Sequence, residues 1–112
     1  MTSAVYSVVS DDRQALLAAA GISGERFQIT RIFQGTGVTM IRIAFQAGQI
    51  MKEHSTSAPL VVQVLDGELA FRVGGDEITM PTGAILFVEP NAVHELEARQ
   101  DTHVLLTLST PV

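Results

Sequence analysis

The chain has 112 residues, no cysteine, and a formal net charge of −5. Its length fits one domain with one core, and the lack of cysteine excludes disulfides and thiolate metal sites. Without a Lys/Arg cluster, a signal peptide or an apolar run near the roughly 20 residues of a membrane span, we expect a cytoplasmic protein with no nucleic-acid and no membrane partner.

The first predicted element is a short helix near the N-terminus. Ser10, Asp11 and Asp12 offer side-chain oxygens that can cap its start, and the following residues are rich in alanine and leucine. Gly21 is expected to end the helix. We assign residues 1–24 to a helical extension outside the main fold.

Short β-rich runs follow from residue 25 onward, separated by turn residues such as Asp66-Gly67 and Gly74-Gly75. About eight strands are predicted, over residues 27–33, 38–45, 60–65, 68–73, 77–80, 84–88, 94–98 and 103–108. Regular short strands favour an antiparallel sandwich or barrel, and the lack of helical periodicity after Gly24 argues against βαβ units. We therefore expect an all-β fold in a single domain over residues 1–112, with the barrel over residues 25–110.

Two stretches of the chain resemble the motifs of the cupin family. The family's first motif runs glycine, five residues, His-x-His, three or four residues, glutamate, six residues, glycine, and Gly48, His54 and Gly67 stand at matching positions. The second motif runs glycine, five residues, Pro-x-Gly, two residues, histidine, and Gly83 and His94 are in register with it. The resemblance covers the chain beyond its N-terminal helix. It implies a double-stranded β-helix, or jelly-roll, barrel with a short N-terminal helix.

The same motifs lack two of the four ligands that the family uses to hold a metal. Thr56 stands where the second histidine belongs, and Leu60 or Val61 stands where the glutamate belongs. Asn91 replaces the turn glycine of the second motif, which asparagine tolerates because it enters the left-handed region more easily than most residues. The fold signal is therefore more specific than the functional signal.

His54 and His94 are the central candidates for the site, because their motif positions imply that both rings point into the barrel from neighbouring strands. Neutral imidazole binds zinc, iron, nickel or copper, but a metal site normally needs three protein donors. A third donor would have to come from Thr56, Glu53, Gln63 or a bound substrate. We favour a barrel without a cofactor, in which the two histidines hydrogen-bond a ligand or each other. The alternative is a divalent transition metal held by His54 and His94.

Three further residues complete the predicted ligand-binding set. Lys52 faces the pocket if it shares the inward face with His54, or is a solvated lysine that protects an edge strand. Gln63 lies among valines and leucine and would face either the pocket or a dimer partner, since a buried amide needs hydrogen-bond partners. Met51 would line the pocket or fill the core. His103 is expected on the surface or at an interface.

The sequence predicts a cupin-fold protein that binds a small, largely apolar molecule in its barrel. The alternatives are a metal-dependent enzyme, either a dioxygenase or an isomerase, that uses His54 and His94, and a ligand-sensing module. Apolar residues make up 46% of the chain and charged residues only 17%, which is more apolar surface than a small monomer readily hides. We therefore expect a homodimer. Neither a reaction nor a ligand can be read from the residues.

Overall fold

The computed structural model describes residues 5–111, which form one short helix and nine strands. Strands dominate because β-branched and apolar residues recur in short runs between turns. The elements are α1 (Arg13–Ala18), β1 (Gln28–Gly35), β2 (Val38–Phe45), β3 (Ile50–His54), β4 (Leu60–Asp66), β5 (Glu68–Val73), β6 (Asp76–Pro81), β7 (Ile85–Val88), β8 (His94–Ala98) and β9 (Thr102–Ser109).

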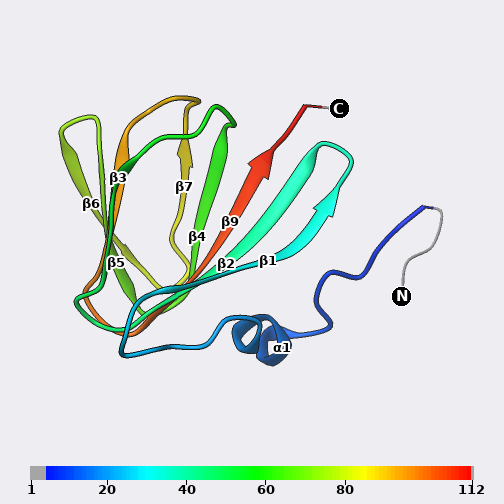
Figure 1. The fold of residues 1–112 in the computed structure, drawn as a ribbon, viewed down its shortest axis with the longest axis horizontal. Helices are drawn as coiled ribbons and strands as arrows, with labels where there is room; N and C mark the ends of the chain where they lie inside the picture. Colours follow the sequence, from blue (N-terminus) through cyan, green and yellow to red (C-terminus); the bar gives the residue numbers. More distant parts are fainter. Residues whose placement is uncertain (1–4, 112) are drawn as a thin grey trace.

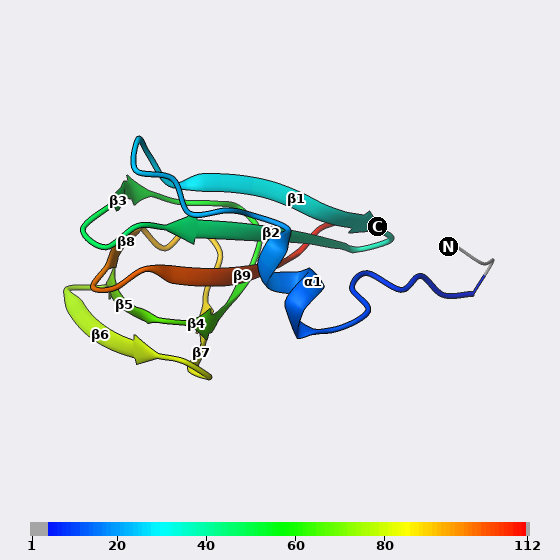
Figure 2. The same ribbon diagram turned by 90° about the horizontal axis from the view of Figure 1, so that it is seen from below.

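The strands form two antiparallel sheets that face each other. The larger sheet has the order β1-β2-β9-β4-β7, and the smaller has the order β3-β8-β5-β6. Neighbours in each sheet are often distant in sequence, as with β2 and β9 or β3 and β8. Figure 1 shows the two sheets as facing layers, and Figure 2 shows α1 lying beside the larger sheet near β2 and β9. The predicted all-β jelly-roll barrel with a short N-terminal helix is confirmed.

The core lies between the sheets and is formed by alternate side chains along the strands. On β4, Leu60, Val62 and Val64 are buried, while the residues between them are only partly covered. On β8, Leu96 and Ala98 are buried from the opposite sheet. Burial of a side chain the size of valine or leucine contributes about 1.5–3 kcal/mol, so these inward rows hold the sheets together.

One turn glycine is required by its surroundings. Gly67 joins β4 to β5 with φ of 105°, a conformation that side chains rarely adopt. A Cβ atom at this position would overlap the main-chain oxygen of Asp101 and would lie 2.8 Å from the Cα of Thr102. The motif glycine therefore allows the β4–β5 turn to pack against the chain entering β9.

The helix begins as expected but ends differently. Asp12 is its N-cap, and the Asp12 carboxylate accepts a hydrogen bond from the amide of Ala15 at 2.8 Å. The prediction that Gly21 ends the helix is wrong, because α1 stops at Ala18 and its C-cap is Ala19 in a right-handed conformation. The guanidinium of Arg42, on β2, instead donates hydrogen bonds to carbonyl oxygens at the end of the helix. No helix within residues 5–111 is long and apolar enough to cross a bilayer.

Candidate functional site

Strand β3, which is not among the eight predicted strands, carries one of the two motif histidines. It pairs with β8 so that Met51 lies opposite Leu96 and His54 lies opposite His94, with a register shift between these two pairs. In a regular strand, residues 51 and 54 would point to opposite faces. The bulge between them turns both side chains toward the interior.

A pocket of about 260 Å³ opens between the two sheets, and both motif histidines line it. Among residues 5–111, the other side chains that line it are apolar apart from Thr56. The apolar lining residues are Ile29, Ile41, Ile43, Met51, Leu60, Phe71, Leu96, Leu106 and Leu108. A concave apolar site with a few convergent polar groups is the usual form of a small-molecule site.

The two imidazoles lie against each other in this pocket. Their ring centroids are 4.3 Å apart and their planes are tilted by 67°. His94 is only 2% exposed and stacks on Phe71, with centroids 5.5 Å apart, whereas His54 is exposed at the edge of the pocket. The sequence prediction that residues 54 and 94 meet in one cavity agrees with this geometry.

Both imidazoles are oriented by the main chain two residues earlier. Nδ1 of His54 lies 2.7 Å from the carbonyl oxygen of Lys52, and Nδ1 of His94 lies 2.9 Å from that of Ala92. A carbonyl oxygen can only accept, so each Nδ1 carries the proton and donates it. In the neutral form of each ring, Nε2 is therefore a bare acceptor.

The His94 ring is held in its neutral form by its surroundings. Burial lowers the pKa of His94 below its usual value, and the adjacent His54 lowers it further. The hydrogen bond to the Ala92 carbonyl opposes these effects but is smaller than burial. Near neutral pH, His94 thus presents one fixed acceptor, Nε2.

Of the other predicted site residues, only Met51 lines this pocket. Lys52 is exposed and Gln63 is half-buried, and neither is among the lining residues. The bulge explains why the Lys52 side chain does not line the pocket: His54 shares the inward face with Met51, and not with Lys52. Gln63 lies opposite Ile85 of β7 on the outer face of the larger sheet. His103 is half-buried, and its Nδ1 accepts a hydrogen bond from Arg42 at 2.6 Å.

The positions of the missing family ligands also lie at the pocket. Thr56 and Leu60 both line it, whereas Val61 does not, so Leu60 stands at the place of the glutamate. Among the described residues, no group of three or more His, Cys, Asp or Glu side chains could hold a metal ion. The side chains around His54 and His94 therefore supply two nitrogen donors, one fewer than a resident transition metal normally requires.

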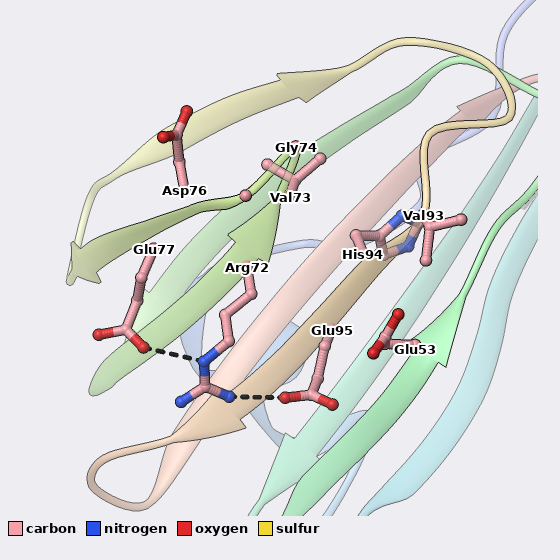
Figure 3. A pocket seen from close by; sticks show the side chains of 10 residues that line it. Glu53, Arg72, Val73, Gly74, Asp76, Glu77, Val93, His94 and Glu95 are labelled. Atoms are coloured by element: carbon pink, nitrogen blue, oxygen red, sulfur yellow. Dashed lines mark hydrogen bonds and ion pairs between the residues drawn. The ribbon is translucent and has the colours of Figure 1, made fainter.

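A second hollow of about 330 Å³ lies beside the first, and His94 lines both. In the described part of the chain, its wall carries the cation Arg72 and four carboxylates, from Glu53, Asp76, Glu77 and Glu95. Figure 3 shows Arg72 between Glu77 and Glu95, to which it donates at 2.8 and 2.7 Å. Arg72 also pairs with Glu97 at 2.5 Å, and its hydrogen bond lowers the pKa of that carboxyl. Sequence reasoning did not predict this acidic cleft.

Comparison with solved structures agrees with the fold. An RmlC-like cupin protein from Desulfovibrio desulfuricans is 29% identical, with a TM-score of 0.77 over 86% of this chain and 93% of that one. The TT1209 protein from Thermus thermophilus is 21% identical, with a TM-score of 0.80 over 94% and 100% of the two chains. SPY1581, a protein of unknown function from Streptococcus pyogenes, is 18% identical, with a TM-score of 0.78 over 87% and 85%.

The sequence itself also matches a family model. No curated protein matches the chain significantly. The model of the cupin domain, however, matches residues 41–110, which is more than half of the chain and includes both motif histidines. Together with the two-sheet barrel, this match shows that the chain belongs to the cupin family.

Proposed function

We propose that this cupin binds a small, largely apolar molecule between its two sheets, with His54 and His94 as the polar contacts. The observation that supports this function is the composition of the pocket wall: two imidazoles and one threonine in an otherwise apolar lining. Its volume of about 260 Å³ lies near the lower end of ligand sites, so the molecule is the size of a substituted benzene ring rather than a nucleotide.

Binding of toluene, measured by amide chemical shifts and calorimetry, tests this proposal. Toluene is expected to shift the amides of pocket residues and to stabilise the protein against heat as its concentration rises. Leu106→Phe fills part of the pocket and is expected to abolish both effects, while Ile85→Val on the outer face leaves them unchanged. Equal binding by both variants, or no binding of toluene to the native chain, contradicts the proposal.

A metal-dependent cupin enzyme, such as a dioxygenase or an isomerase, is the second candidate. One observation favours it: histidines that ligate metals usually donate their other ring N–H to a carbonyl or carboxylate, as His54 and His94 do. The remaining donor would have to be an oxygen of the substrate. Metal analysis of the purified protein separates the candidates, because one equivalent of iron, zinc, manganese or nickel that is lost in His54→Ala and His94→Ala would favour the enzyme.

We also propose that the protein is a homodimer that pairs through the outer face of β4 and β7. Ile85 is 64% exposed and Phe87 is 57% exposed on edge strand β7, and they lie opposite Gln63 and Val61 of β4. These four side chains carry no charge, so a second copy with the same apolar surface fits them by two-fold symmetry. Light scattering is expected to give twice the chain mass. Phe87→Glu should give a monomer, and Val93→Glu, which lies at the acidic cleft, should not.

A further inference from the structure

The hydrogen bonds that the two imidazoles already make determine which ligands they can still bind. The inference that follows rests on the proposed binding function. We infer that the pocket selects molecules that combine an apolar body with a hydroxyl donor, in the chemical class of phenols, over ethers and carboxylates of the same shape. This selectivity depends on which ring nitrogen of His54 and His94 carries the proton.

The main chain fixes both rings with Nδ1 as the donor. The Lys52 and Ala92 carbonyl oxygens lie 2.7 and 2.9 Å from the Nδ1 atoms of His54 and His94. A ring flip or the other tautomer would leave these carbonyls without their donor. In its neutral form, each ring therefore offers Nε2 as an acceptor and has no second proton to donate.

These acceptors are open to a ligand. Among the described residues, neither Nε2 has a hydrogen-bond partner. No buried side-chain nitrogen in the same residues lacks a partner, so the unpaired Nε2 atoms are not buried. For His94, which is 2% exposed, this means that Nε2 reaches the open space that the ring lines. The ring cannot turn away, since it is held between Phe71 on one side and His54 on the other.

Charge around the pocket argues against an anionic ligand. Within residues 5–111, no lysine or arginine lines the pocket, and the Lys52 side chain lies outside it. The adjoining cleft bears carboxylates from four residues, and its cation, Arg72, already pairs with three glutamates. A carboxylate in the pocket would meet two acceptor lone pairs without a counter-charge, which makes its desolvation unfavourable. A neutral O–H group fits the same place without that cost.

Three monosubstituted benzenes test the inference: phenol, anisole and benzoate. Anisole replaces the hydroxyl proton with a methyl group, and benzoate replaces the donor with an anion. Phenol is expected to bind about tenfold more tightly than anisole near neutral pH, because phenol donates its one proton to an imidazole Nε2 and anisole has no proton to donate. Benzoate is expected to bind more weakly than either. Calorimetry gives the affinities, and the amide shifts of Met51 and Leu96 show that the probe is in the pocket.

Variants then tie the preference to the histidines. In His94→Phe, the preference for phenol over anisole is expected to fall to about twofold or less while anisole still binds, since phenylalanine keeps the bulk but not the acceptor. His54→Phe should lower the ratio as well, whereas Lys52→Ala should leave it unchanged. Thermal unfolding without ligand shows that each variant is folded. An unchanged ratio in both histidine variants would overturn the inference.

The other outcomes separate this inference from the proposed function. Equal binding of phenol and anisole, or preferred binding of benzoate, overturns the donor selectivity but leaves an apolar binding pocket. If none of the three probes nor toluene binds, the proposed function fails, and the inference fails with it. Nitrogen-15 shifts of the imidazoles give a readout without ligand: Nδ1–H tautomers are expected for both rings, and a dominant Nε2–H tautomer of His94 contradicts the argument.

Discussion

Arg42 is a fully buried charged side chain that makes six hydrogen bonds. Arg42→Met is expected to reduce stability by about 3 to 4 kcal/mol. The residue is fully buried on β2, at 0% exposure. Its guanidinium donates to His103 Nδ1 and to five main-chain carbonyls, which belong to Leu16, Leu17, Ala20, Ile43 and Val104. Three of these carbonyls lie at the end of α1, so the side chain joins the helix to the sheet.

The magnitude follows from two opposing contributions. Hydrogen bonds from a charged donor stabilise by about 1.5 kcal/mol each at the low end of their range. Desolvation opposes them: burial lowers the pKa of Arg42 to about 10, and a drop of this size corresponds to roughly 3 kcal/mol. The five carbonyl bonds therefore outweigh desolvation by about 4 kcal/mol, and water that reaches the helix carbonyls in the variant recovers part of the loss.

Urea unfolding at neutral pH, followed by far-ultraviolet circular dichroism, measures this change. Arg31→Met is the matched control, because Arg31 is exposed on the neighbouring strand β1, and it should change stability by less than about 0.5 kcal/mol. Hydrogen exchange of residues 13–20 should become faster in Arg42→Met, since α1 loses its contact with the sheet. A loss below about 1 kcal/mol, or unchanged exchange in α1, would refute the reasoning.

Three further outcomes are expected from the pocket and the turns. Thr56→His adds a third imidazole to the lining and should create a site for about one zinc or nickel ion per chain, measured by calorimetry against the native chain. Because burial lowers the pKa of folded His94, the unfolded chain takes up the proton first, so this contribution to stability is complete above about pH 6.5 and decreases as pH falls below it. His94→Phe should therefore reduce the fall in urea midpoint between about pH 7.5 and pH 5.5, and the fall that remains is assigned to His103, whose pKa burial also lowers. Gly67→Ala should cost at least about 3 kcal/mol and Gly83→Ala about 1 kcal/mol, because both have positive φ but only Gly67 lacks room for a Cβ atom; equal urea midpoints would contradict this.

The sequence was sufficient for the fold because its local signals agree with one another. Alternation on β4 and β8 marks the inward rows, and Asp66-Gly67 marks a turn that the structure contains. The motif spacing also brought His54 and His94 to one place, although they lie on strands that are distant in sequence. The inward rows and the turn follow from period and turn chemistry, which each act over a few residues, whereas the meeting of the two histidines is what the resemblance to the cupin motifs implies.

The features that were missed depend on contacts between distant segments. The polar run Lys52-Glu53-His54 gives no alternation from which a bulge can be read, so Lys52 and Met51 are both predicted pocket residues, although only Met51 lines the pocket. Arg42 occupies an outward position on β2, where a charged residue is ordinary, and it is buried only because α1 covers that face. The apolar Leu16-Leu17 pair was the available signal, since a short amphipathic helix must cover some surface.

The orientation of the two histidine rings does not depend on the two metal ligands that this cupin lacks, because each ring is held by a hydrogen bond to its own strand or turn. Each Nδ1 binds a main-chain carbonyl two residues earlier, and substitutions at positions 56 and 60 do not remove those carbonyls. Both rings thus keep their main-chain partner at Nδ1 even though threonine and leucine stand at the places of the other donors. What changes is the partner that these acceptors can bind: two ring nitrogens in an apolar wall are too few for a resident cation, but one is sufficient to accept the proton of a hydroxyl group.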